Sequence, residues 1–130
     1  MREHLDHHPT DPETGEYHYR RDWHYEDKMA WEMGMPYAFA DGYQNEMVLS
    51  HVITNWMGDD GFIKKLAVRD AVLMFHGDVT RIMGKVTKKY VENDEHLVDV
   101  EMRSENLDGS LTFNTGVATV RLVSKEDIKY

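Results

Sequence analysis

His24 lies in the stretch YRRDWHYEDKMA, residues 19–30, which combines charged, aromatic and imidazole side chains. An unperturbed histidine changes its charge near neutral pH, so His24 is a candidate general base. In an extended segment, side chains two residues apart point to the same side, which allows Asp22 and His24 to face one cleft. Such a pair could hold and deprotonate a water molecule. The alternative is a local ion pair of Asp22 with Arg20 and Arg21, next to a structural histidine.

Composition and charge exclude several classes of protein. The chain of 130 residues has no cysteine, which rules out thiolate catalysis, thiolate metal sites and a disulfide framework. Its formal net charge of −9 matches a nucleic-acid backbone poorly. The apolar runs are far shorter than the roughly 20 residues of a membrane span, and the N-terminus does not resemble a signal peptide. We therefore expect a cytoplasmic protein that binds neither nucleic acid nor membranes.

Residues 1–16 are rich in proline, histidine and acidic side chains, and we interpret them as an N-terminal arm or loop. Several histidines near this end raise the question of a metal site. Their spacing matches no known metal-binding motif, and an arm would hold ligands poorly, so we expect no metal. These histidines are His4, His7, His8 and His18.

A helix over about residues 42–57 is the clearest element of the sequence. Apolar side chains recur there at helical spacing, at Val48, Leu49, Val52, Ile53 and Trp56. Asp41 can cap this helix, with Gln44 at the spacing of a capping box. Gly58 favours termination of the helix.

The remainder of the chain predicts strands. Residues 62–76 are mixed and apolar, and residues 78–91 are rich in β-formers. Residues 97–103 alternate between apolar and charged side chains, and residues 111–123 alternate again. The intervening NLDGS is a hairpin signal. One long helix followed by four strands predicts an α+β fold in which an antiparallel sheet lies against the helix.

Three stretches resemble the MaoC-like branch of the hot-dog fold, which includes R-specific enoyl-CoA hydratases and hydroxyacyl dehydratases. They are RDWHYEDKMAWEMGMPYAFADG, TNWMGDDGFIKKLAVRDAVLMFHGDVTRIMGKVTKKY and NLDGSLTFNTGVATVRL. The resemblance covers roughly residues 17–123. It implies a single hot-dog domain over residues 17–130, whose sheet wraps the central helix.

The catalytic signature of this family is an aspartate, four residues, and a histidine. His24 falls on the histidine, and Tyr19 falls where the family keeps its aspartate. In the family these two residues hold the water that adds to C3 of a 2-enoyl thioester, and amides at the start of the central helix bind the thioester oxygen. The resemblance assigns those amides to Gly42 and Tyr43. Tyr19 is a hydrogen-bond donor or acid at neutral pH and not a base.

Two carboxylates are candidates to replace the missing aspartate. Asp22 can act with His24 from the same segment, and Asp41 can reach in from the helix start. For Asp41, a simple N-cap is the favoured interpretation. Trp23 is either a wall of the substrate site or a packing residue.

The resemblance implies an enoyl-CoA hydratase or 3-hydroxyacyl-CoA dehydratase that uses no cofactor beyond the CoA carried by its substrate. The first alternative is a non-catalytic acyl-CoA-binding subunit of a heteromeric hydratase, which the tyrosine at position 19 favours. The second is an acyl-CoA thioesterase with Asp41 as its carboxylate. The family's channels lie at subunit interfaces, so we expect a homodimer or a hetero-oligomer with another hot-dog subunit.

Overall fold

The structure is a computed structural model that describes residues 13–15 and 23–124. The predicted boundary between the arm (1–16) and the domain (17–130) lies outside the described residues. The chain divides into two compact units, which are treated separately. Among the described residues, one unit contains those up to Asp41 together with Met74–Gly77, and the other contains Gly42–Leu73 and residues 78–124.

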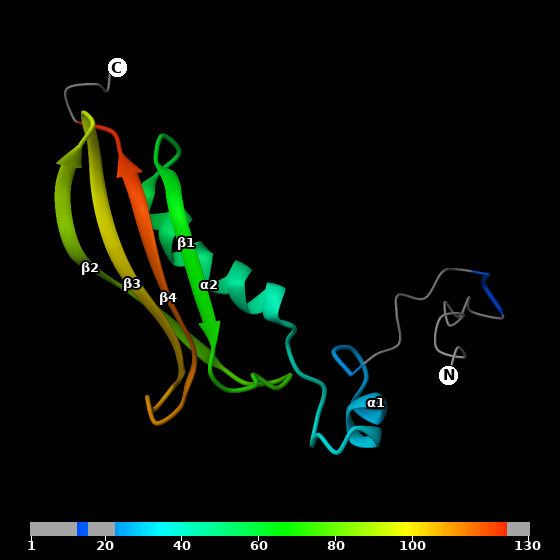
Figure 1. The fold of residues 1–130 in the computed structure, drawn as a ribbon. Coiled ribbons are helices and arrows are strands. Elements are labelled where there is room, and N and C mark those ends of the chain that lie inside the picture. Colours follow the sequence, from blue (N-terminus) through cyan, green and yellow to red (C-terminus); the bar gives the residue numbers. More distant parts are fainter. Residues whose placement is uncertain (1–12, 16–22, 125–130) are drawn as a thin grey trace, which may run out of the picture. The chain divides into compact units, whose positions relative to one another are not determined.

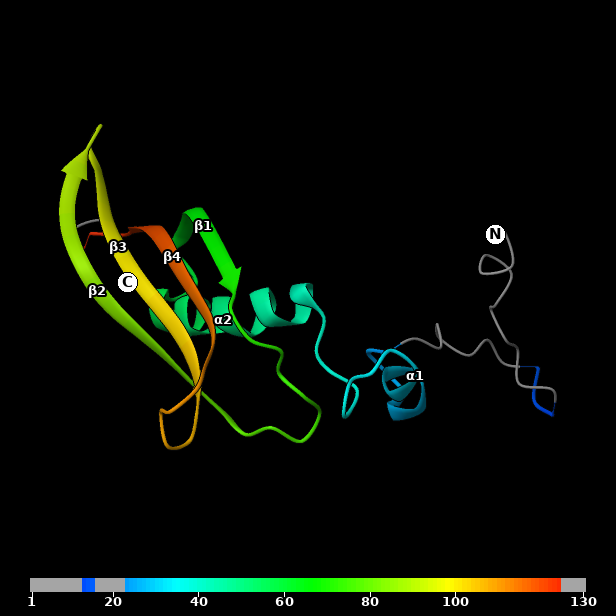
Figure 2. The ribbon, with the colours of Figure 1, turned by 60° about the horizontal axis from the view of Figure 1, so that its bottom comes forward.

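The second unit is a single helix on a four-stranded antiparallel sheet. Its elements are α2 (Gly42–Met57), β1 (Phe62–Asp70), β2 (Thr80–Glu92), β3 (Glu95–Asn106) and β4 (Thr112–Leu122). The strand order is β1-β4-β3-β2, and α2 lies across one face of the sheet (Figure 1). Figure 2 shows that β2, β3 and β4 are curved. The predicted α+β class and the four strands are confirmed.

α2 spans the predicted residues and ends before Gly58, which has a φ of 74°. A positive φ favours glycine directly after a helix. Leu49 and Ile53 are buried at 0% and 1% exposure, but Val48 and Trp56 are 36% and 48% exposed. The predicted apolar stripe is therefore wider than the buried one, because a single sheet covers only one side of the helix.

The core consists of side chains from α2 and from the inward-facing positions of the strands. The buried members are Leu49, Ile53, Val98, Val100, Met102, Ala118 and Val120. The strand members follow the alternation predicted for residues 97–103 and 111–123. The central strands β3 and β4 thus contribute most of the buried surface beneath the helix.

Two tight turns set the register of the sheet. Asn93 and Asp94 join β2 to β3 and have φ values of 51° and 62°. Positive φ at both central residues defines the two-residue turn that matches the twist of a hairpin. The predicted NLDGS turn joins β3 to β4, where the Asn106 amide donates to the Leu111 carbonyl (3.0 Å) and Gly109 has a φ of 74°.

Gly116 on β4 allows α2 to approach the sheet closely. A Cβ atom at Gly116 would lie 2.9 Å from Leu49 Cδ2, which is closer than real Cβ contacts, and 3.1 Å from both Met102 Cε and the Ala67 carbonyl oxygen, which is tighter than most. Gly84 on β2 also faces the helix, but its Cβ would lie 3.6 Å from Val52 and Val100. That spacing is ordinary van der Waals contact. Of these two helix-facing glycines, Gly116 is the one that the packing requires.

We predict that Gly116→Ala destabilises the fold by about 1–3 kcal/mol, because the added methyl overpacks the core. The matched variant Gly84→Ala adds the same methyl where space exists, and should be neutral or gain up to about 1 kcal/mol from reduced backbone entropy of the unfolded chain. Urea unfolding followed by circular dichroism measures both. Equal stabilities for the two variants would contradict the packing described.

Candidate active site

His24 is fully engaged through both ring nitrogens. Its Nδ1–H donates to the Phe39 carbonyl oxygen (2.9 Å), and its Nε2 accepts a hydrogen bond from the Trp23 indole N–H (3.0 Å). The Phe39 ring meets the imidazole edge-on, with centroids 4.8 Å apart. His24 is therefore held as the neutral Nδ1–H tautomer. Its basic lone pair becomes available to water only when Trp23 moves away.

The unit around His24 is built on the short helix α1 (Asp27–Glu32). The Asp27 carboxylate accepts a hydrogen bond from the Ala38 amide (2.8 Å), which ties the helix start to the following segment. That segment pairs with residues 74–76 through the Ala40 amide to the Met74 carbonyl and the His76 amide to the Ala38 carbonyl, both 2.9 Å. Ala30, Ala38 and Phe39 are buried here. The result is a small scaffold that fixes the carbonyl to which His24 donates.

The structure does not describe all the predicted site residues. Tyr19 and Asp22 lie among residues 16–22, outside the described part of the chain. Trp23 is 38% exposed, and its indole N–H donates a hydrogen bond to His24. This contact positions the His24 ring whether or not Trp23 also contacts a substrate. Asp41 directly precedes α2, in the N-cap position that the sequence predicted.

In the second unit, the start of α2 combines an exposed backbone with a positive dipole end. Gly42 and Tyr43 open the helix, both are exposed, and the first turn contains no acidic residue. The first amides of a helix have no partner inside it, and they carry the positive end of the helix dipole. This is a place where a developing negative oxygen would be stabilised.

A carboxylate stands against this helix start. Asp70 ends β1, and a Cβ atom at Gly42 would lie only 3.2 Å from Asp70 Oδ2. The other oxygen, Oδ1, accepts a hydrogen bond from the Asn114 side-chain amide (2.5 Å). Asn114 is in turn held by Ser104, whose hydroxyl donates to Asn114 Oδ1 (2.6 Å) and accepts from the Asn114 backbone amide (3.1 Å).

Sequence reasoning missed this row of three polar residues across β1, β4 and β3. Asn114 and Ser104 are 2% and 1% exposed, and register places Asp70 opposite Asn114 and Asn114 opposite Ser104. A signal was available. Ser104 lies two residues after Met102 on the same strand, so its side chain points to the same inward face of the sheet. The alternation therefore predicts a polar side chain at a core position.

Asn45 adds a fourth polar group on the helix side. It is 5% exposed and belongs, with Leu49 and Ile53, to the buried stripe of α2. Within the described part of the chain, its Oδ1 atom is buried and accepts no hydrogen bond. Leu49 packs over Gly116, so Asn45, one turn nearer the helix start, lies toward the row that contains Asn114.

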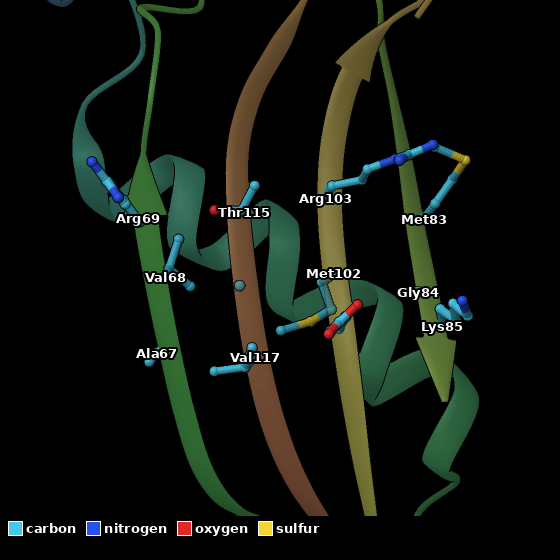
Figure 3. Close-up of a pocket in the computed structure, with 12 residues that line it drawn as sticks. Ala67, Val68, Arg69, Met83, Gly84, Lys85, Met102, Arg103, Thr115 and Val117 are labelled. Carbon is cyan, nitrogen blue, oxygen red and sulfur yellow. The ribbon is translucent and has the colours of Figure 1, made fainter. Parts of the chain in front are cut away.

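A groove of about 690 Å³ lies on the opposite face of the sheet (Figure 3). Basic, apolar and acidic side chains line this groove. The basic ones are Arg69, Lys85 and Arg103, the apolar ones include Ala67, Met83 and Val117, and the carboxylate is Glu101. Arg103 is paired with the buried Glu105 (3.1 Å). No histidine lines the groove, so its composition suits binding of an anion better than proton transfer.

No group of three or more histidine, aspartate or glutamate side chains among the described residues could hold a metal ion, and the N-terminal histidines lie outside these residues. No helix within residues 13–15 and 23–124 is long and apolar enough to cross a membrane.

Solved structures show what this chain is similar to. A chain of the ChsH1–ChsH2 complex from Mycobacterium tuberculosis matches with a TM-score of 0.68 and 22% identity, over 79% of this chain and 76% of that chain. An (R)-hydratase from A. caviae involved in PHA biosynthesis matches with a TM-score of 0.67 and 18% identity, over 78% and 75%. A monoamine oxidase regulatory protein from Archaeoglobus fulgius matches with a TM-score of 0.57 and 19% identity, over 78% and 72%.

These similarities confirm the hot-dog fold that the sequence resemblance implied. No protein-family model matches the chain, and no curated protein matches its sequence. At 18–22% identity the likeness establishes the fold, and activity has to be argued from the residues.

We predict that Asn45→Leu stabilises the protein by about 1–3 kcal/mol, because it removes a buried acceptor without a donor and keeps a similar shape. Asn55→Leu makes the same change at an exposed position of α2 and should stay within about 0.5 kcal/mol of wild type. Thermal and urea unfolding compare the two. Destabilisation by Asn45→Leu would mean that Asn45 makes a favourable contact in the resting protein.

Proposed function

We propose that this protein is a hydro-lyase for acyl-CoA thioesters, which adds water to a 2-enoyl-CoA or removes it from a 3-hydroxyacyl-CoA. The observation that carries the proposal is the exposed start of α2, with Gly42 and Tyr43 in the first turn of a hot-dog helix. The similarity to an (R)-hydratase supports the same reaction class.

Hydration of an enoyl thioester requires an electron sink. As water oxygen bonds to C3, the π electrons of the double bond shift toward C2 and the thioester oxygen becomes negative. The amides of Gly42 and Tyr43 are the proposed donors to that oxygen, because they are at the positive end of the α2 dipole. Glycine at the first position lets a thioester approach the backbone closely.

His24 is the proposed base. Its Nε2 takes a proton from water as the C3–O bond forms, and the resulting imidazolium returns the proton to C2, so that one water molecule adds in total. The hydrogen bond from Nδ1–H to the Phe39 carbonyl supports this role, because it fixes the tautomer that leaves Nε2 as the basic atom. Asp22 and Asp41 remain the carboxylates that the sequence proposes beside it. Trp23, which covers Nε2, is proposed to make way for substrate.

Hydration involves no net oxidation or reduction, so the proposed chemistry needs no redox cofactor. The proposed base and the helix amides fill the roles that a metal ion would otherwise supply. The chain therefore acts with the CoA thioester alone. Its lack of cysteine suits a reducing, cytoplasmic compartment.

A non-catalytic acyl-CoA-binding subunit is the second candidate. Tyr19 stands at the family's aspartate position, and the lone pair of His24 is occupied by Trp23. The similarity to a chain of a two-protein complex, ChsH1–ChsH2, supports this alternative.

Either candidate is proposed to act as an oligomer with a second hot-dog subunit. On α2, Tyr43, Met47 and Trp56 are 77%, 58% and 48% exposed, which is an unusual amount of apolar surface for one helix. Within the described residues, the long strand β2 is at one edge of the sheet and pairs with β3 alone, and open edges of this kind favour association.

A hydration assay tests the proposal. Purified protein is mixed with 2-enoyl-CoAs, and loss of the conjugated thioester absorbance is followed. We expect wild type to be active and His24→Ala to lose about 100-fold or more in kcat, as removal of a general base does. His51→Ala, an exposed histidine on α2, is the matched control and should keep full activity.

His24→Gln guards against a folding defect, because the glutamine amide can still donate to the Phe39 carbonyl. Both His24 variants should keep the wild-type melting temperature within a few degrees. Full activity in folded His24→Ala would contradict the mechanism. Activity that requires a second hot-dog subunit would favour the binding-subunit candidate, and release of free thiol would indicate a thioesterase.

A further inference from the structure

We propose that Asp70 is a catalytic residue of this site, which holds the attacking water through Oδ2 at the start of α2. Asn114 and Ser104 are its positioning residues. The inference rests on the proposed hydro-lyase function and names the carboxylate that the tyrosine at position 19 leaves missing.

The direction of each hydrogen bond in the row is determined. The Asp70 carboxylate can only accept a hydrogen bond, so the Asn114 side-chain group that faces it is the amino group, which donates to Asp70 Oδ1. The Asn114 side-chain oxygen then faces Ser104, whose hydroxyl donates to it and whose oxygen accepts from the Asn114 backbone amide. Ser104 and Asn114 are almost fully buried, so this orientation is rigid. The Ser104–Asn114 pair thus holds Asp70 Oδ1 as an acceptor and makes no hydrogen bond to Asp70 Oδ2.

The other oxygen faces the helix start. Asp70 Oδ2 accepts no hydrogen bond from any described residue. It lies so close to Gly42 that a Cβ atom added there would be only 3.2 Å from it. A water that donates to Oδ2 is therefore held beside the amides proposed to bind the thioester oxygen. Asp70 is exposed, so water and substrate can reach it.

Asn45 is a second, independent sign that a ligand enters this layer. A buried acceptor without a donor costs about 1–3 kcal/mol, so such groups call for a partner. Asn45 Oδ1 is a buried acceptor of this kind, and Asn45 belongs to the buried stripe in the first turns of α2. A ligand group that entered the polar layer beneath the start of α2 would supply the missing donor. An arrangement that served only packing would place an apolar side chain there.

The test is the variant Asp70→Asn in the same hydration assay. The Asn114 amino group still requires an acceptor, so the new amide presents its oxygen to Asn114 and its own amino group toward Gly42. The variant therefore keeps the internal hydrogen bond but turns an acceptor for water into a donor. We expect kcat to fall about 100-fold or more with the melting temperature unchanged.

Asp99→Asn is the matched control. Asp99 lies on β3 and also accepts side-chain hydrogen bonds, from Tyr90 (3.1 Å) and Thr119 (2.9 Å). Partial desolvation and the Asp99 carboxylate raise the pKa of Tyr90, so its hydroxyl remains a donor at neutral pH. Asp99 faces away from α2, as its alternation with the buried Val98 and Val100 shows. Asp99→Asn should leave kcat unchanged.

Two further variants separate a chemical role from a structural one. Gly42→Ala crowds Oδ2 without disturbing the helix, so kcat should fall while the protein remains as stable as wild type. Ser104→Ala frees the Asn114 amide to rotate and should lower kcat more than it changes KM. Ser104→Thr keeps the hydroxyl and should restore kcat.

Each outcome is decisive. Loss of activity in Asp70→Asn but not in Asp99→Asn, with both proteins folded, supports the assignment. An active wild type with an equally active Asp70→Asn overturns the role of Asp70 and leaves the proposed function standing. An inactive wild type, alone and with a second hot-dog subunit, overturns the proposed function and with it the role of Asp70.

Discussion

The close packing of α2 against the sheet is the constraint on which the rest of the structure depends. Gly116 removes a side chain at the point where Leu49 meets β4, so that the helix lies directly on the strands. Once that contact is fixed, the rigid geometry of the helix determines where its first turn lies. The first turn then meets the end of β1, where Asp70 stands against Gly42. Packing in the middle of the helix thus positions the chemistry at its start.

The layer beneath the helix changes character along its length. Toward the middle it is aliphatic, with Ile53 and Val120 fully buried. At the start of the helix it is polar, with Asn45 on one side and the Ser104–Asn114 pair on the other. A buried amide that lacks a partner lowers stability, and groups of this kind persist where function requires them. The polar end of the core is therefore the part of the fold best explained by a ligand.

Most of the fold could be predicted from the sequence because it depends on local periodicity. The helix at residues 42–57 and the alternation through residues 97–103 were both read correctly, since each is set by neighbouring residues. The turn at Asn93 and Asp94 was not identified, because neither residue is glycine although both adopt positive φ. Exposure of Trp56 was also missed, because helical periodicity cannot say how far a sheet reaches around a helix.

The candidate site was less accessible to sequence reasoning. Asp70 and Asn114 are 44 residues apart and meet only through the pairing of β1 with β4, and the register of that pairing is not written in either strand alone. The engagement of His24 by Trp23 and Phe39 likewise depends on how the short segment after α1 folds back. Resemblance to a family directed attention to His24, whereas the carboxylate at the helix start became visible only in three dimensions.

The most direct test of this account is a crystal structure with a 3-hydroxyacyl-CoA bound. We expect the thioester oxygen to lie about 2.7–3.2 Å from the amide of Gly42 or Tyr43, and the 3-hydroxyl to contact Asp70 Oδ2 at a similar distance. An acyl group bound instead in the groove on the opposite face of the sheet, between Arg69 and Lys85, would contradict it.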